Sequence, residues 1–248
     1  MIEILPPKRS VLRPLFEYHV RQRVVIDAVL EQPYGEVLTD IATHPQLARL
    51  QLGAFKLFAG DPRHPQAETF ITTCNPGLFI AENDLWKKKI LNTLGDQCST
   101  YLRTGFSFEH LKRDHVLKLA QNVPPNYTIR ALDFKRAESE YTETAYDTPE
   151  KLYQSGTGFC ALRGSEVASV AIAYTNSHQG IEIQIYTNDQ HKQKGLATCT
   201  SATLVAHCLE NGIDPHWSAA NAISANLAQK LGYIKNDQYE AIVYRPHK

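Results

Sequence analysis

The chain has 248 residues, of which 43% are hydrophobic, so it can form one large domain or two smaller ones with apolar cores. Lysine plus arginine equals aspartate plus glutamate at 26 each, which argues against a nucleic-acid partner or an anionic membrane surface. No apolar run approaches the length of a membrane span, and the first residues lack the basic start and apolar block of a signal peptide. We therefore expect a cytoplasmic protein.

Five scattered cysteines without a Cys-x-x-Cys pair predict neither a disulfide framework nor a zinc site, and we expect no metal. Cys199 and Cys208 are expected to be small buried thiols. A covalent acyl-cysteine at Cys199 is the weaker alternative, because no histidine is placed by spacing to activate that thiol.

The first half of the chain predicts a mixture of helices and short strands without a motif for chemistry. An apolar stripe at helical spacing predicts a helix within residues 10–32. The other elements expected here are strands at 36–39, 55–58, 78–80 and 100–104, and helices after His44-Pro45, at 84–94 and from Ser107 to near Val123. Pro124-Pro125 cannot continue a helix, so we place a domain boundary there. The predicted domains are 1–123 and 126–248.

The second half predicts several strands first and then helices and strands in alternation. The expected strands lie at 127–132, 159–162, 167–174, 180–187, 214–218, 233–235 and 239–244, the last two forming a hairpin joined at Asn236-Asp237. Helices are expected from Gly195 to Leu209 and from the N-cap Asn221 to Gly232, and a polar segment at 138–146 could be helical. This order predicts an α/β fold of the mixed, α+β type, with helices on the faces of a mixed sheet.

The segment from Gly180 to Leu209 reads as strand, polar loop and helix, and it carries the main functional prediction. A loop that brings unpaired backbone N–H groups and lysines to a helix N-terminus favours a bound phosphate. Lys192, Lys194 and Gly195 fit this requirement, since Gly195 lets the backbone approach a bulky anion. An ordinary solvated basic loop is the alternative that this segment alone leaves open.

Two motifs in this half resemble those of the GNAT N-acetyltransferases. Lys192-Gln-Lys-Gly-Leu-Ala197 resembles the acyl-CoA pyrophosphate loop of that family, although Lys192 replaces the usual arginine or glutamine. Asn221-Ala-Ile-Ser224, followed by Leu227-Ala-Gln-Lys-Leu-Gly-Tyr233, resembles the family's later helix. The likeness is closer to the two-domain branch that includes the zwittermicin A resistance acetyltransferase, with correspondence in the first half at 35–40, 53–61 and around Trp86.

The resemblance implies a C-terminal GNAT-like domain after a smaller mixed α/β domain that shapes, covers or dimerises it, which leaves a homodimer open. It further implies acetyl-CoA as co-substrate and the primary amine of a small molecule as acceptor. Amides at the strand end would bind the pantetheine arm, the loop would bind the diphosphate, and the later helix would line the arm. The residues so implied are Ile185, Tyr186, Thr187, Lys192, Gln193, Lys194, Gly195, Leu196, Ala197, Thr198, Asn221 and Ser224.

Glu182 is the expected base, because an alkylammonium must lose a proton before its nitrogen can attack a thioester. A strand glutamate about ten residues before the loop often has this role in the family. The alternative is a charged strand residue paired with a lysine or arginine. Many members of the family have a tyrosine seven residues after the asparagine that protonates the departing thiolate, but Ala228 stands at this position here. Either another group donates the proton, or none is needed, because the thiol of coenzyme A is a tolerable leaving group near neutral pH. Tyr233, Tyr186 and His216 are the candidate donors, and for each of them a structural role is the stronger interpretation.

Two other functions stay open at this stage. A non-catalytic acyl-CoA-binding module would account for Ala228 and for the imperfect loop. Acylation of a protein or of an aminoacyl-tRNA is weaker, because the chain has no basic surface bias.

Overall fold

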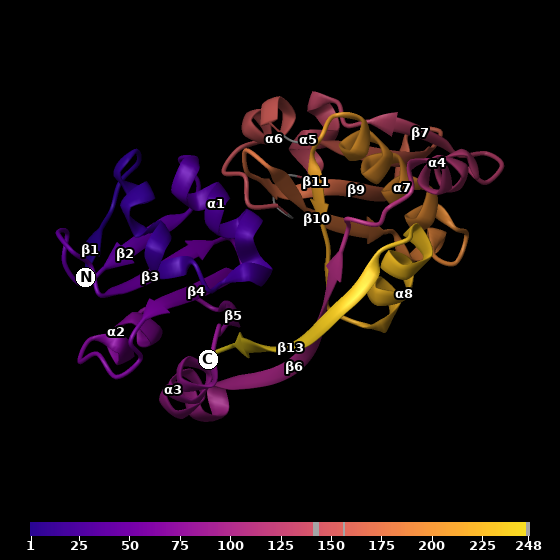
Figure 1. Cartoon of the computed structure of the whole chain (residues 1–248). Coiled ribbons are helices and arrows are strands. Elements are labelled where there is room, and N and C mark those ends of the chain that lie inside the picture. Colours follow the sequence, from indigo (N-terminus) through magenta and orange to yellow (C-terminus); the bar gives the residue numbers. More distant parts are fainter. Residues whose placement is uncertain (141–143, 156, 247–248) are drawn as a thin grey trace. The chain divides into compact units, whose positions relative to one another are not determined.

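The computed structural model describes residues 1–140, 144–155 and 157–246, and the chain divides into two compact units (Figure 1). The first unit comprises Met1–Arg103 and Tyr239–Lys248, and the second comprises Thr104–Gln238. The chain therefore enters the second unit within one strand, β6, and returns within another, β13. The boundary expected at Pro124-Pro125 lies inside the second unit, so the two units do not coincide with the predicted ranges 1–123 and 126–248.

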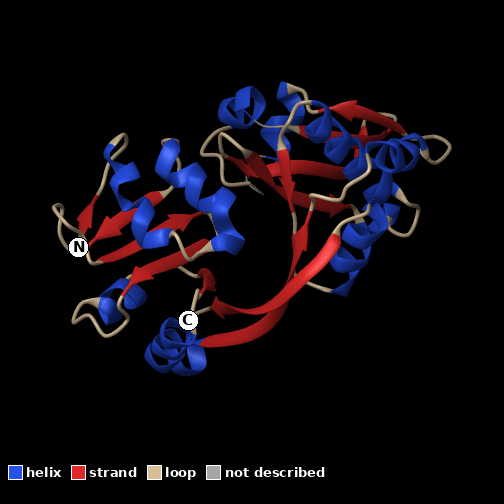
Figure 2. Cartoon of the chain, viewed as in Figure 1, coloured by secondary structure: helices blue, strands red, loops and turns tan. Residues whose placement is uncertain are grey.

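The first unit is built on a sheet with strand order β1-β2-β3-β4-β5-β13 (Figure 2). Neighbours β1 to β4 are antiparallel, β4 and β5 are parallel, and β13 is antiparallel to β5. Its strands are β1 (Ile2–Glu3), β2 (Glu36–Thr39), β3 (Leu47–Leu52), β4 (Phe55–Gly60), β5 (Gly77–Ile80), β6 (Cys98–Ser107) and β13 (Ile234–Tyr244), the last two continuing into the second unit. Its helices are the 3₁₀ segments η1 (Lys8–Phe16), η2 (Val20–Gln22) and η3 (Gly95–Gln97), and α1 (Arg23–Glu31), α2 (Ala67–Thr72) and α3 (Asp84–Leu94).

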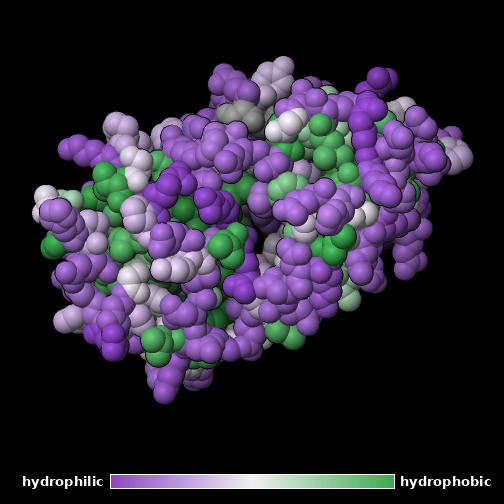
Figure 3. Space-filling view, in the orientation of Figure 1, coloured by the Kyte–Doolittle hydropathy of each residue, from purple (hydrophilic) through white to green (hydrophobic). Residues whose placement is uncertain are grey.

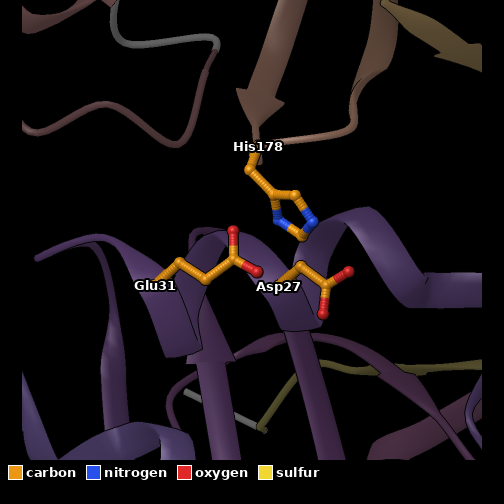
Figure 4. Close-up of side chains that lie close together, drawn as sticks. All are labelled: Asp27, Glu31 and His178. Atoms are coloured by element: carbon orange, nitrogen blue, oxygen red, sulfur yellow. The ribbon is translucent and has the colours of Figure 1, made fainter.

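Aromatic side chains fill much of the core of the first unit. Phe58 on β4 stacks on Trp86 of α3 and packs against Phe79 of β5. Elsewhere in the unit, Arg13 of η1 forms ion pairs with Asp27 and Glu31. Figure 4 shows these two carboxylates projecting from α1, and the ion pairs tie η1 to that helix. His178, which the same figure labels, belongs to the turn between β9 and β10 of the second unit.

The second unit contains a five-stranded sheet with the order β11-β10-β9-β8-β7. Only the pair β10 and β11 is parallel. The strands are β7 (Thr128–Ala131), β8 (Gly158–Arg163), β9 (Glu166–Asn176), β10 (Gly180–Thr187), β11 (Asp214–His216) and β12 (Ser218–Ala219), the last pairing with β6. The helices are α4 (Arg113–Gln121), α5 (Phe134–Glu140), α6 (Pro149–Ser155), the 3₁₀ turn η5 (Asp189–His191), α7 (Leu196–Glu210) and α8 (Ala222–Leu231).

Apolar residues of α7 pack on the sheet and on neighbouring helices, which fixes this helix at the end of β10. Leu204 and Cys208 of α7 contact Ile181 of β10 in one buried cluster, and Val205 joins a second cluster with Leu231 of α8. No described helix is long and apolar enough to cross a bilayer. On the face drawn in Figure 3, hydrophilic residues predominate and apolar residues occur in small separate groups.

The mixed α/β fold class is confirmed, and several predicted elements have their expected bounds. The strands at 36–39 and 180–187 and the helix at 84–94 agree with β2, β10 and α3. The strands expected at 159–162 and 167–174 are present as β8 and β9, which pair antiparallel, and Asn221 is the N-cap of α8.

Three predicted elements are wrong. The helix within 10–32 is divided into η1, η2 and α1, in part because Pro14 has no N–H to donate inside a continuous helix. The helix after Pro45 is instead β3, which lies between β2 and β4 with residues of both faces buried. The hairpin at Asn236-Asp237 is one continuous strand, β13, which lies between β5 and β6 in the sheet, so sheet pairing prevails over a local turn preference.

The polar segment at 138–146 is helical only as far as Glu140 among its described residues. Residues 141–143 lie outside the described part, and residues 144–146 are not helical. The helix α6 was not predicted. The helix expected from Ser107 begins only at Arg113.

Candidate active site

The strands β10 and β11 form a fork at one edge of the five-stranded sheet. Their parallel pairing covers three residues and ends with Glu182 opposite His216. After this pair the chain of β11 continues to β12, which pairs with β6, while β10 continues to Thr187 beside β9 alone. In the described structure, Ile183–Thr187 therefore has no strand partner on the side away from β9, and we call this side the unpaired edge. The predicted pantetheine-binding residues Ile185, Tyr186 and Thr187 lie along it.

The loop after β10 presents backbone N–H groups that the protein itself does not use. Among the described residues, no acceptor is found for the N–H groups of five consecutive residues, which are Gln193, Lys194, Gly195, Leu196 and Ala197. The next amide, that of Thr198, donates to Gly195 O at 3.1 Å. These five residues end at the N-terminus of the 15-residue helix α7, where unpaired donors and the helix dipole favour an anion.

Two residues of the loop adopt left-handed backbone conformations. Gln193 has φ +61° and Gly195 has φ +80°. No atom lies within 4 Å of the position that a Cβ would take at Gly195, so the backbone is accessible there. The loop therefore fits the phosphate-sized anion that the sequence predicts.

Both lysines of the loop already have partners within the protein. Lys192 forms an exposed ion pair with Asp189, and the hydrogen bond to that carboxylate raises the pKa of Lys192. Lys194 Nζ donates to Gln190 O at 2.9 Å and to the hydroxyl of Tyr127 at 3.4 Å. Their charges lie near the free amides, but each side chain would have to give up these contacts in order to contact a ligand.

The buried side chain of His191 connects the loop to the sheet. This side chain is 2% exposed, and Nδ1 lies 2.8 Å from the hydroxyl of Tyr127. Its Nε2 lies 3.0 Å from a carboxylate oxygen of Glu166, although the two atoms are not aligned as a hydrogen bond. Tyr127, which precedes β7, and Glu166, at the start of β9, are thus joined to the turn η5.

Glu182 is buried, with 8% of its surface exposed, and it lies opposite Thr175 on β9 as well as opposite His216 on β11. Residues that are paired across a sheet project from the same face, so these three polar side chains lie together. Thr175 Oγ1 is buried, and no group of the described structure forms a hydrogen bond with it. A bound ligand could supply that partner.

The first turn of α8 is fixed by polar contacts of the two residues predicted there. Asn221 Oδ1 accepts from the amide of Ser224 at 2.9 Å and caps the helix. Ser224 Oγ accepts from Trp217 Nε1 at 3.1 Å. Asn221 is exposed and Ser224 half-buried, so both can also contact a ligand.

Three positions that bear on the catalytic interpretation lie in the interior. Ala228 is fully buried in the apolar cluster of α7 and α8. Tyr233 is buried and its hydroxyl donates to Pro215 O at 2.9 Å; burial, with smaller effects from Cys208 and Glu182, raises its pKa well above the usual range. Cys199 is also buried, which raises the pKa of its thiol and agrees with the predicted packing role rather than with a nucleophile.

Sequence reasoning missed the residues that hold the loop, above all His191, Tyr127 and Glu166. They lie far apart in the chain, and only the pairing of β7, β8 and β9 brings them together. A histidine within a polar loop is one local signal, yet the sequence does not show that its ring is buried.

Comparison with known proteins gives the same family as the two motifs. The family model described as GNAT acetyltransferase matches residues 13–242. The uncharacterised N-acetyltransferase YdfB of Bacillus subtilis (strain 168) is 25% identical over 255 residues, covering 96% of each chain.

Solved structures agree over the whole length. A GCN5-related N-acetyltransferase-like protein from Streptococcus suis 89/1591 has a TM-score of 0.86 and 25% identity, covering 98% of this chain and 100% of that one. A tandem GNAT protein from the clavulanic acid biosynthesis pathway shares the fold with a TM-score of 0.58 and 9% identity. The match covers 100% of this chain and 98% of that one. Because the family model matches nearly the whole sequence, the chain belongs to the GNAT acetyltransferases, enzymes that use acetyl-CoA as co-substrate.

Proposed function

We propose that this acetyltransferase transfers the acetyl group of acetyl-CoA to the primary amine of a small molecule by direct attack, with Glu182 as the base. The observation that carries the proposal is the run of unused backbone N–H groups from Gln193 to Ala197 at the start of α7. A diphosphate would accept from these amides, and the pantetheine arm would follow the unpaired edge of β10 toward the fork.

The geometry at the fork suits the reaction. An arm that runs beside Ile185–Thr187 would bring its thioester toward Glu182, which marks the end of the strand pairing. The carboxylate would take a proton from the incoming ammonium, and the neutral nitrogen would attack the thioester carbonyl. An amide at the unpaired edge would donate to the carbonyl oxygen as negative charge develops there.

For the amine that accepts the acetyl group, we propose a chemical class and not a single compound. Likeness to the branch that includes the zwittermicin A resistance acetyltransferase favours an aminopolyol, and we propose membership of that branch on the three matching segments of the first half. A panel of aminopolyols, diamines and amino acids therefore forms the first acceptor screen.

The test combines binding with turnover. Calorimetry should show acetyl-CoA binding to the wild-type chain, and a suitable amine should cause release of free thiol. Glu182→Gln should keep the affinity for acetyl-CoA and reduce kcat by about 100-fold, the lower end of the effect of a positioned base. Glu138→Gln, an exposed glutamate of α5, is the matched control and should leave both unchanged.

Each negative outcome has a distinct meaning. Unchanged turnover in Glu182→Gln removes this residue from the mechanism. Binding of acetyl-CoA without turnover for any amine favours a non-catalytic module, the second function that Ala228 had left open. A chain that does not bind acetyl-CoA overturns the proposal.

A further inference from the structure

The described structure places the residues considered as proton donors to the departing thiolate very differently. Ala228 stands where the resemblance implies a tyrosine, and it is fully buried among apolar residues. The hydroxyl of Tyr233 donates to Pro215 O in the interior, and Tyr186 is 57% exposed on β10. The third polar substitute, His216, lies at the fork itself.

We propose that His216 is the catalytic acid that protonates the departing thiolate of coenzyme A. Its Cα is paired with that of Glu182 at the last position before β10 and β11 separate. The two side chains leave the sheet on the same face, so a base and an acid stand side by side where the thioester of a bound arm would lie. The inference rests on the proposed function, because that function places the thioester at the fork.

The surroundings of His216 favour a fixed but accessible ring. The residue is half-buried, and its ring lies 4.8 Å from that of Phe108, tilted by 59°. This aromatic contact restricts rotation of the imidazole while leaving part of it exposed. A histidine is well suited to the role, because its ordinary pKa lies near neutral pH.

The proton balance of the step closes with these two residues and solvent. Glu182 takes one proton from the ammonium, and the neutral nitrogen forms a bond to the carbonyl carbon of the thioester. The carbon–sulfur bond then breaks, and the sulfur keeps the electron pair and takes a proton from a ring nitrogen of His216. The nitrogen loses its remaining extra proton to solvent, and Glu182 and His216 return to their starting states by exchange with solvent.

The test uses His216→Gln, with His207→Gln as the matched control. His207 is also half-buried and also lies against an aromatic ring, that of Phe159, but it belongs to α7 away from the fork. With the best amine of the panel, His216→Gln should lower kcat about 100-fold and leave KM for acetyl-CoA within about threefold. His207→Gln should change neither value.

A second measurement does not depend on the acceptor. The ultraviolet absorbance of the thiolate reports the ionisation of coenzyme A bound to the protein as the pH rises. A donor next to the sulfur stabilises the thiolate, so the bound thiol should ionise at lower pH in the wild type than in His216→Gln. His216→Asn repeats the comparison if the glutamine disturbs packing against Phe108, and circular dichroism checks the fold of each variant.

Two outcomes would overturn the inference in different ways. If His216→Gln binds coenzyme A and shows wild-type kcat with unchanged ionisation of the bound thiol, His216 is not the acid while the proposed function stands. If the wild type does not bind acetyl-CoA in calorimetry, the proposed function and this inference are lost together.

Discussion

The first unit repeats the order of elements of the second, and the two copies differ at the places to which we assign the function. In each unit a first strand and short helices precede three antiparallel strands, which are followed by a helix, a parallel strand and another helix. Thus β2-β3-β4-α2-β5-α3 corresponds to β8-β9-β10-α7-β11-α8. The fork between β4 and β5 also comes after three paired residues, the last being Leu57 opposite Ile80.

The two forks differ in chemistry. Leu57 and Ile80 are buried apolar residues in the positions that Glu182 and His216 occupy in the second unit. Beyond Leu57, side chains of the first unit use the edge of β4: His19 Nε2 lies 2.9 Å from Phe58 O, and Trp86 Nε1 donates to Gly60 O at 2.8 Å. The first unit has filled the edge that the second leaves unpaired.

The loops that follow β4 and β10 also differ, since the first has its amides bound internally and the second does not. In the loop before α2, four amides are bound internally, namely those of Arg63, His64, Gln66 and Ala67. The helix that follows has six residues, against 15 in α7. A chain can therefore keep this order of elements with the loop amides bound internally, so the free amides of the second unit do not result from the topology alone. We expect one acetyl-CoA site per chain, which calorimetric stoichiometry measures directly.

Removing Trp86 should have the largest effect on this comparison. The side chain is 1% exposed and stacks on Phe58, so Trp86→Ala should lower the free energy of unfolding of the first unit by about 3–5 kcal/mol. Chemical denaturation measures the change, and Trp86→Phe, which keeps a ring against Phe58, should lose less. We expect Trp86→Ala still to bind one acetyl-CoA per chain. A second site in this variant would mean that the Trp86 side chain is the only reason why the first unit does not bind acetyl-CoA.

Acid should weaken the first unit through His19, the other group at its filled edge. Burial lowers the pKa of His19 from 6.5 to about 4, despite the opposing bond to Phe58 O. The unfolded chain takes up this proton first as the pH falls below 6.5, so stability is full above 6.5 and declines toward pH 4. The difference corresponds to about 3 kcal/mol at pH 4. Chemical denaturation of wild type and His19→Gln between pH 7 and 4 measures how the free energy of unfolding changes with pH in each. If both change equally, His19 is not the cause of the acid destabilisation.

Local patterns in the sequence predicted the second fork better than the first. In β10, Ile181, Ile183 and Ile185 alternate with polar residues and face the apolar side of α7, so the pattern shows both the strand and the polar face of Glu182. In β3 five of six residues are buried, including the charged Arg49, so polarity does not mark an exposed face, and Pro45 suggested a helix start instead. The pattern of a strand is informative only where one of its faces is polar.

The site was predictable where a local motif carries it and not where distant segments meet. Gly195 and Asn221 could be found because helix ends have strong local preferences. The pairing of Glu182 with His216 depends on the register of two strands 34 positions apart, which no local rule sets. The repeat of the fold was also hidden, because its matching positions, such as Leu57 and Glu182, differ in chemistry.

Substituting Gly195 should separate the function of the loop from its stability. Alanine there would be held at φ +80°, which costs about 1–2 kcal/mol, and its Cβ would project toward the proposed diphosphate. We expect affinity for acetyl-CoA to fall at least tenfold. Gly164→Ala is the matched control, with φ +61° and equally open space in the turn between β8 and β9, and it should lose similar stability without losing affinity. Equal affinities of both variants would place the anion elsewhere.

The smallest expected effect concerns how the second unit keeps its loop free. Since the amides from Gln193 to Ala197 have no acceptor in the described structure, we infer that side chains help to hold the loop. The hydroxyl of Tyr127 contacts both His191 and Lys194. Tyr127→Phe should lower stability by about 1 kcal/mol, as for one lost hydrogen bond, and weaken acetyl-CoA binding by about threefold to fivefold. Tyr153→Phe, exposed on α6, should change neither. If Tyr127→Phe loses stability but keeps full affinity, the loop holds its amides free without this contact, and its two left-handed residues suffice.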